Sequence, residues 1–299
     1  MSVFVAGSLH LDVIVRAPHL PRADETVRGE GVAYVAGGKG GNQAVAAARM
    51  GARVAMAGRV GTDGFGERLI AHLHAAGVDC AGVARDPGPS GMSVAIVDAD
   101  GSYGAVIVSA ANLAIDPGAV VPPADARVVL LQNEVPEAVN LAAARGARAA
   151  GACAILNAAP ARAVTAELMA LIDVLIVNRI EAADMLGLPE IGDPAEAAAR
   201  LGALGPRAVI VTLGAGGLVV WEDGKAQAMA AHRVAVVSTH GAGDAFAGAL
   251  AAALDAGEGL GAAAAFGQAA AALHVAAPEG ARGAITPEAV RALMRGAAP

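Results

Sequence analysis

The sequence predicts an α/β fold in which a mostly parallel sheet is covered by helices on both faces. Two observations lead to this prediction: short runs that are apolar at every position recur along the chain, and segments with helical spacing lie between them. Strands that are buried on both faces of a parallel sheet are typically apolar along their whole length. The runs that predict core strands are Val3–Ala6, Val54–Ala57, Val128–Leu131, Ala154–Leu156, Val174–Val177 and Ala208–Val211.

Helices are predicted between these runs and toward the carboxyl end of the chain. Their apolar residues recur at the spacing of one helix face, and several of the segments end at a glycine, which is a common helix terminator. The predicted helices are Asn42–Met50, Phe65–Ala76, Pro136–Ala149, Pro194–Leu204, Ala242–Ala256, Ala262–Ala276 and Pro287–Arg295.

Residues of about 12–35 and about 89–109 instead carry alternating patterns that are rich in strand-forming side chains. Within the second region, Ser93–Val97, a turn at Asp100-Gly101 and Ala105–Ser109 predict a hairpin. A few strands with one apolar face cannot bury that face alone. We therefore expect a single domain over residues 1–299, with an inserted small sheet that lies over the main cleft or pairs with a second copy as a homodimer.

Composition narrows the class of protein. Hydrophobic residues make up 56% of the 299 residues and aromatic residues 2%, and the formal net charge is −7, which excludes disorder and argues against nucleic-acid binding. The two cysteines, Cys80 and Cys153, are too few for a disulfide framework, so we expect a reducing cytoplasm. The uncharged run Gly259–Pro278 is mostly Ala and Gly, which favours a packed helix over a membrane span, and no signal peptide is expected.

One motif combines small residues with an acid at a predicted helix start. Gly241-Ala242-Gly243-Asp244 follows a Val-rich segment that we interpret as a strand. Small residues let backbone N–H groups converge, and the helix N-terminus adds positive charge, so the turn could form an anion hole. Asp244 could then take a proton from a hydroxyl while the hole stabilises a transferring phosphoryl group. From these residues alone, a tight turn with a capping aspartate is the alternative.

A glycine-rich segment before the first predicted helix completes a series of motifs. With it, the chain resembles the ribokinase (PfkB-type) carbohydrate kinase family nearly from end to end. The resembling segments, in the order found in that family, are Gly7–Asp12 (first strand), Gly37–Arg49 (first signature), Gln132–Glu134 (substrate strand), Asn178–Glu181 (N-x-x-E motif), Thr212–Gly217 (nucleotide turn) and Thr239–Asp244 (second signature).

The resemblance implies a ribokinase-like three-layer α/β/α sandwich in which the small sheet is a lid. It implies an ATP-dependent kinase that uses Mg²⁺ and transfers the γ-phosphoryl group to a primary hydroxyl. D-ribose is the leading acceptor, and another sugar, a sugar acid or a nucleoside is the alternative. A sugar- or nucleotide-binding regulator without catalysis is the alternative from a different class.

The resemblance also implies individual roles. Asp244 would be the base, with the amides of Gly241, Ala242 and Gly243 forming the anion hole. Glu181 would hold Mg²⁺ through water, because Mg²⁺ keeps much of its hydration shell. The residues implied to bind the sugar, besides Asp244, are Asp12, Gly38, Lys39, Asn42 and Glu134. Those implied to bind ATP are Asn178, Thr212, Gly214, Gly217 and Gly243.

Purely structural roles are open for most of these residues. They are a strand-end turn for Asp12, a solvated side chain for Lys39, a helix cap for Asn42, a turn with a helix-start acid for Asn178 and Glu181, and a hairpin turn for Gly216-Gly217. Contact of His10 with the substrate is likewise open, because this histidine lies within the first motif.

The chain departs from the family pattern around the second signature. Ser238 stands where the family usually has an Asp that helps to hold a monovalent cation, and His240 stands in place of a Thr. We therefore expect weak K⁺ activation, and fixed positive charge from His240 or Arg282 is one open alternative. The lid end Ala110-Ala111-Asn112 also lacks the Gly common there, which leaves the acceptor sugar less defined.

Overall fold

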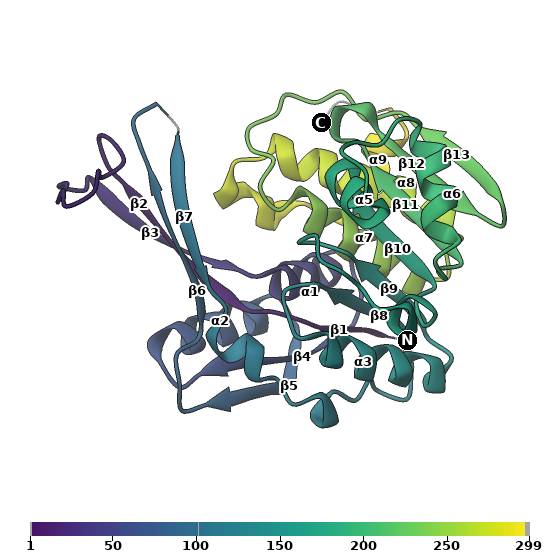
Figure 1. Ribbon diagram of the computed structural model, residues 1–299, viewed down its shortest axis with the longest axis horizontal. Helices are drawn as coiled ribbons and strands as arrows, with labels where there is room; N and C mark the ends of the chain where they lie inside the picture. The colour runs from purple at the N-terminus through teal and green to yellow at the C-terminus, as the bar shows by residue number, and fades with distance from the viewer. Residues whose placement is uncertain (1, 101, 297–299) are drawn as a thin grey trace.

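The computed structural model describes residues 2–100 and 102–296, and in this part of the chain the predicted core strands join one large sheet (Figure 1). Its strand order is β13-β12-β11-β10-β9-β8-β1-β4-β5, and all neighbours are parallel except the pairs that β12 forms. The strands are β1 (Ser2–Ala6), β4 (Val54–Gly61), β5 (Asp79–Asp86), β8 (Ala126–Gln132), β9 (Cys153–Asn157), β10 (Val174–Asn178), β11 (Ala208–Thr212), β12 (Leu218–Glu222) and β13 (Lys225–Met229).

Helices cover both faces of this sheet, as predicted. Alternate residues of β1 show the division: Val3 and Val5 belong to one buried cluster, whereas Phe4 and Ala6 belong to the other. The first cluster is closed by α1 (Lys39–Arg49), α2 (Gly64–Ala75), α7 (Ala242–Asp255), α8 (Leu260–Ala276) and α9 (Pro287–Met294). The second is closed by α3 (Glu137–Ala150), α4 (Ala166–Met169), α5 (Arg179–Leu186) and α6 (Pro194–Gly202).

A second sheet, which we call the lid, extends away from this body (Figure 1). It contains β3 (Gly31–Gly37), β2 (His10–Arg16), β6 (Gly91–Val97) and β7 (Tyr103–Val108), in that order. The predicted hairpin corresponds to β6 and β7, which pair antiparallel, although Gly101 of its turn lies outside the described residues. Short 3₁₀ turns at Ala110–Ala114, Pro117–Ala119, Gly214–Gly216 and Glu279–Ala284 complete the described elements.

The Val-rich segment before the second signature was wrongly predicted as a strand. Residues 230–239 form no strand in the structure, and β13 ends at Met229. Instead, the N–H groups of Val237 and Ser238 donate to the carbonyl oxygen of Val275, at 2.8 and 3.2 Å. That carbonyl lies in the last turn of α8, where helix carbonyls lack partners within the helix. The segment is therefore held by a helix end rather than by the sheet.

The Ala-rich run near the carboxyl end forms α8, whose small side chains pack closely against α7. Within the described residues, none of the helices combines the length and the apolar character needed to cross a membrane.

Candidate active site

A cavity of about 940 Å³ lies at the carboxyl ends of the parallel strands, bordered by the lid. Ligands of open α/β sheets commonly bind at this edge, where loops after neighbouring strands converge. Glu134, Asn157, Asn178 and Thr212, at the ends of β8 to β11, all line the cavity. The lid contributes Asp12, Ile14, Val35, Ser93, Ala95, Val97, Ala105 and Ile107.

The start of α7 forms the opposite wall. Gly241 is its N-cap residue at φ +76°, a conformation that favours glycine, and no side chain caps the helix. First-turn N–H groups of an uncapped helix are available to an anion. The backbone N–H group of Ala242 donates a hydrogen bond to the carbonyl oxygen of Thr239 at 3.2 Å. Gly241, Ala242 and Gly243 all line the cavity, beside Asp244.

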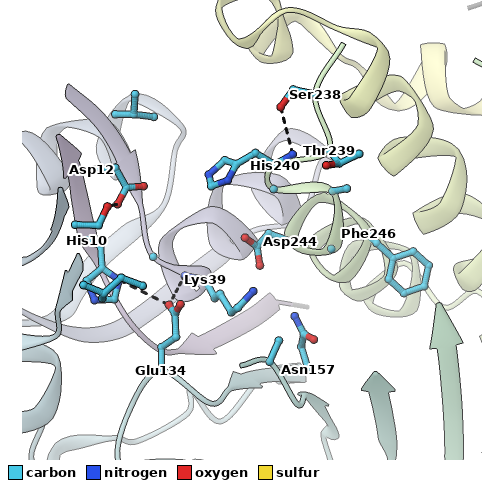
Figure 2. Close-up of a pocket in the computed structure, with 18 of the residues that line it drawn as sticks. His10, Asp12, Lys39, Glu134, Asn157, Ser238, Thr239, His240, Asp244 and Phe246 are labelled. Carbon is cyan, nitrogen blue, oxygen red and sulfur yellow. Dashed lines mark hydrogen bonds and ion pairs between the residues drawn. The ribbon is translucent and has the colours of Figure 1, made fainter. Parts of the chain in front are cut away.

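Asp244 lies within the first turn of α7 and is 6% exposed. Its two carboxylate oxygens accept hydrogen bonds from Asn42 Nδ2 at 3.1 Å and Gln43 Nε2 at 3.0 Å. The alternative in which this aspartate caps its own helix therefore does not hold. In Figure 2, Asp244 and Lys39 point toward one another within the cavity.

The surroundings of Asp244 have opposing effects on its pKa. Burial raises its pKa above the ordinary aspartate value, and the nearby Glu134 carboxylate raises it further. The Lys39 charge and the two amide donors lower the pKa, because they stabilise the ionised form. Burial is the largest of these effects, and the pKa is raised overall. A raised pKa suits a group that accepts a proton near neutral pH.

The first signature starts α1 three residues earlier than predicted. Gly38, at φ +85°, is the N-cap residue, so Asn42 lies inside the helix and its amide reaches Asp244. This placement corrects the alternative in which Asn42 caps the helix. Gly38 and Lys39 line the cavity, whereas Asn42 stands behind Asp244.

Glu134 and Asp12 are held by short hydrogen bonds. Glu134 Oε2 accepts from Ser8 Oγ at 2.5 Å and from the Lys39 backbone N–H at 2.8 Å. The His10 side chain is buried, and its Nδ1 atom lies 3.7 Å from Glu134 Oε2. Asp12 accepts from Ser93 Oγ at 2.5 Å across the lid. Both carboxylates line the cavity, as Figure 2 shows, so Asp12 is more than a strand-end turn residue.

Asn178 and Glu181 combine a structural role with a place in the cavity. Asn178 caps α5 by accepting from the backbone N–H groups of Ile180 and Glu181, each at 2.9 Å. Glu181 Oε2 accepts in return from the Asn178 backbone at 2.8 Å. Burial raises the pKa of Glu181, opposed by that bond and by Lys39. The helix-start alternative is thus structurally correct, and both side chains still line the cavity.

Thr212 lines the cavity, but the glycines after it form the turn between β11 and β12. Gly217, at φ +90°, leaves no room for a side chain, because a Cβ there would lie 2.0 Å from the carbonyl oxygen of Met229. Gly214 is exposed at φ +57°. Neither glycine lines the cavity, and their contact with ATP stays a prediction.

Ser238 and His240 lie in the cavity wall above α7 (Figure 2), and Arg282 also lines the cavity. Ser238 Oγ accepts from the His240 backbone at 3.3 Å, and His274 Nε2 lies 2.9 Å from the His240 carbonyl oxygen. Burial lowers the pKa of His274, which favours the neutral ring. Two residues where the chain departs from the family pattern, Ser238 and His240, therefore lie together beside the candidate anion hole.

Sequence reasoning missed several residues of this region: Ser8, Gln43, Ser93 and Asn157. Asn157 could have been found, since a polar residue directly follows the apolar run Ala154–Leu156. The other three depend on contacts between distant segments. Among the described residues, no group of three or more His, Cys, Asp or Glu could hold a metal ion.

The fold and the cavity together indicate the class of protein. A parallel sheet whose carboxyl edge brings a buried carboxylate to an uncapped helix start is suited to group transfer between small molecules. The pfkB family of carbohydrate kinases matches residues 1–287, and the chain belongs to this family. It is therefore a phosphotransferase that acts on an alcohol group.

Individual relatives agree with this assignment. The chain is 34% identical over 278 residues to a ribokinase of Bacillus subtilis, covering 92% of each. It is 32% identical over 256 residues to a deoxyribokinase of Salmonella typhi, covering 83% of this chain and 84% of the relative. The structure of an Arabidopsis thaliana ribokinase complexed with ribose and ATP superimposes with a TM-score of 0.91, at 30% identity and 98% coverage of each chain.

Proposed function

We propose that this protein transfers the γ-phosphoryl group of ATP to the primary hydroxyl of D-ribose, forming D-ribose 5-phosphate. One observation carries the proposal: the buried Asp244 carboxylate lies beside an uncapped helix start and shares its cavity with the polar groups Asp12 and Glu134. Asp244 and the helix start suit proton removal and phosphoryl transfer, and Asp12 and Glu134 suit the binding of a polyol. The ribokinase relatives support ribose as the acceptor.

In the proposed mechanism, Asp12, Glu134 and the backbone at Gly38 hold the sugar hydroxyls and direct the primary hydroxyl toward Asp244. Asp244 accepts that hydroxyl's proton as the oxygen attacks the phosphoryl group. The Lys39 charge and the N–H groups at Gly241 to Gly243 stabilise negative charge on the transferring oxygens. The apolar lid residues exclude water that would otherwise compete as an acceptor.

The nucleotide side of the cavity carries Asn178, Glu181 and Thr212. Mg²⁺, bound to the phosphates, supplies charge neutralisation in phosphoryl transfer. The residues fit it: no protein cage of carboxylates occurs among the described residues, and Mg²⁺ usually keeps several waters and few carboxylate ligands. We assign the water-mediated contact to Glu181, next to Asn178, with the ATP phosphates along Thr212.

We also propose a homodimer formed through the lid, in the cytoplasm. The lid face turned away from the cavity exposes apolar side chains on three strands: Val32, Tyr34, Val94, Val106 and Val108. A second copy of the same face could cover them. Both cysteines are free, which fits a reducing compartment.

The test is an ADP-release assay with D-ribose, 2-deoxy-D-ribose, hexoses, sugar acids and nucleosides, with the product identified by NMR. We expect D-ribose to give the highest kcat/KM and the phosphate to be attached at O5. Higher kcat/KM for a nucleoside or a sugar acid would contradict the proposed acceptor. Sugar binding without ADP release in the wild type would instead identify a binding protein without catalysis.

A further inference from the structure

We infer that Gln43, which does not reach the cavity, is a positioning residue for the Asp244 carboxylate. This inference rests on the proposed function only in that it takes Asp244 as the base. Gln43 is fully buried in α1, and its Nε2 donates to Asp244 Oδ1 at 3.0 Å. It is absent from the cavity lining, so its effect on the reaction must pass through Asp244.

The packing of two helices fixes this contact. Gly248 lies one turn after Asp244 on the same face of α7. A Cβ on Gly248 would lie 2.6 Å from the Gln43 carbonyl oxygen and 2.8 Å from the Ala47 backbone nitrogen, so only glycine lets the two helices approach this closely. The α1 backbone therefore lies against α7 at the height where the Gln43 side chain meets the carboxylate.

The orientation of the amide is also determined. If the Gln43 amide were flipped, its oxygen would face the carboxylate, and two acceptors would be in contact. In the observed orientation Oε1 is buried and has no partner among the described residues. A buried polar atom without a partner costs free energy. This cost is tolerated at a position where the other end of the amide holds the base.

The two amide donors act on different oxygens of Asp244. Asn42 bonds Oδ2 and Gln43 bonds Oδ1, so together they restrict rotation of the carboxylate about its terminal torsion. Each oxygen keeps a second lone pair that can accept the proton of the sugar hydroxyl. Removing the Gln43 donor would leave rotation restrained at one oxygen only and would destabilise the ionised form.

The other charged or titratable groups around Asp244 come from four elements. They are Lys39 of α1, Glu134 after β8, Glu181 of α5 and His274 of α8. None of these groups changes in a Gln43 variant, so a change in the titration of Asp244 can be assigned to the lost donor.

The experiment compares the pH dependence of kcat/KM in wild type, Gln43→Met and Gln43→Glu. Gln43→Met keeps the volume and removes the donor. In Gln43→Met, we expect the acidic limb of the kcat/KM profile to shift to higher pH by about one to two units. We expect kcat near neutral pH to fall about tenfold. The sugar KM should change less than about twofold, since Gln43 does not touch the sugar.

Gln43→Glu covers the case in which the Met variant fails to fold. Two adjacent carboxyls share a proton, so the pair loses its second proton only at higher pH, and the titration of the Asp244 carboxyl should extend above its wild-type range. Val45→Ala is the matched control, because Val45 is also buried in α1, at 4% exposure, but its side chain carries no hydrogen-bond donor. It should lose stability without moving the limb.

A second readout separates this inference from the proposed function. A ¹³C NMR titration of the Asp244 carboxyl, assigned with Asp244→Asn, measures its pKa without any turnover. An upward shift in either Gln43 variant supports the inference even if the wild type phosphorylates none of the sugars. Unchanged Asp244 titration and an unmoved acidic limb in both variants would overturn it.

Discussion

At the residue scale, the reaction depends most on Asp244. Replacing it by Asn removes the proton acceptor but keeps the size of the side chain, so we expect kcat to fall by roughly 10²–10⁴. ATP affinity should change little, because the helix start and the nucleotide wall are untouched. Steady-state kinetics and ATP binding by calorimetry check this expectation. Near-normal turnover would exclude Asp244 as the base.

The same variant tests the electrostatics of burial. The pKa of Asp244 is raised in the folded protein, so its contribution to stability is present below the unfolded pKa and is lost as pH rises through the folded pKa. Relative to Asp244→Asn, the wild type should therefore lose unfolding free energy as the pH rises above about 4, the ordinary pKa of an aspartate. Urea unfolding at several pH values measures this difference. A wild type that gains stability relative to the variant over this range would contradict the raised pKa.

The wall above α7 leads to a prediction about potassium. A monovalent cation needs several oxygen ligands, and Ser238 lacks the carboxylate that would best offset dehydration of the ion. Arg282 and His240 line the same cavity. We expect K⁺ to activate the wild type less than about tenfold, which corresponds to about 1.4 kcal/mol in the barrier. Titration of K⁺ into an alkali-free assay of wild type and Ser238→Asp decides this, and larger activation of the wild type would show that an ion site exists.

Sequence motifs identified single residues that the structure places at the cavity, but they did not reveal contacts between distant segments. Asp244 and Glu134 were predicted and line the cavity. The amide bonds from α1 could not be predicted, because 201 residues separate Gln43 from Asp244. Asn42 was expected to contact the sugar. The structure shows that its Nδ2 donates to Asp244, and contact with the sugar stays a prediction.

At the element scale, the end of the lid contains a strained residue. Ala110 has φ +43° and starts the turn that carries Asn112, whose buried side chain bonds both the N–H and the carbonyl of Leu9, at 2.8 and 2.9 Å. A non-glycine residue in this region costs about 1–2 kcal/mol. Ala110→Gly removes this strain, but glycine loses more conformational entropy on folding. The net effect should be a stabilisation of about 0.5–1 kcal/mol.

Chemical unfolding measures this effect, and the neighbouring residue supplies the control. Ala111 is buried and does not have positive φ, so Ala111→Gly should destabilise the protein. If both glycine variants lowered the unfolding free energy, Ala110 would not be strained in solution.

Elements were predicted well where both faces are buried. The predicted core strands read as apolar runs, although the largely buried β12 was not predicted. The strands β5 and β13 lie at the sheet edges and carry polar residues, so periodicity did not reveal them. The helix α5 is short and lacks one-sided apolar spacing. The segment before Ser238 shows the opposite error, because the backbone N–H groups of Val237 and Ser238 donate to a helix end instead of to a strand.

At the scale of the whole molecule, one face of the lid borders the cavity and the opposite face is partly exposed. Register places Asp12, Val35, Ser93 and Ile107 in one row toward the cavity. The adjacent row on the opposite face is formed by Tyr34, Val13, Val94 and Val106. Tyr34 contacts Phe65 of α2, with ring centroids 6.2 Å apart, and is still 47% exposed, so the same chain covers this face only in part. The row becomes more exposed toward β7, where Val106 is 67% exposed.

This exposed row gives a test of the homodimer. A soluble chain rarely leaves a continuous apolar strip uncovered, and a twofold contact would pair the strip with itself. Light scattering at micromolar concentration should give twice the chain mass of 29.1 kDa. Val106→Lys should shift the protein to the monomer, because pairing the strips would bury its charge. Ile107→Lys is the control on the cavity face, where it should lower activity and leave the mass unchanged. A wild-type monomer, or a dimer that survives Val106→Lys, would rule out the lid as the interface.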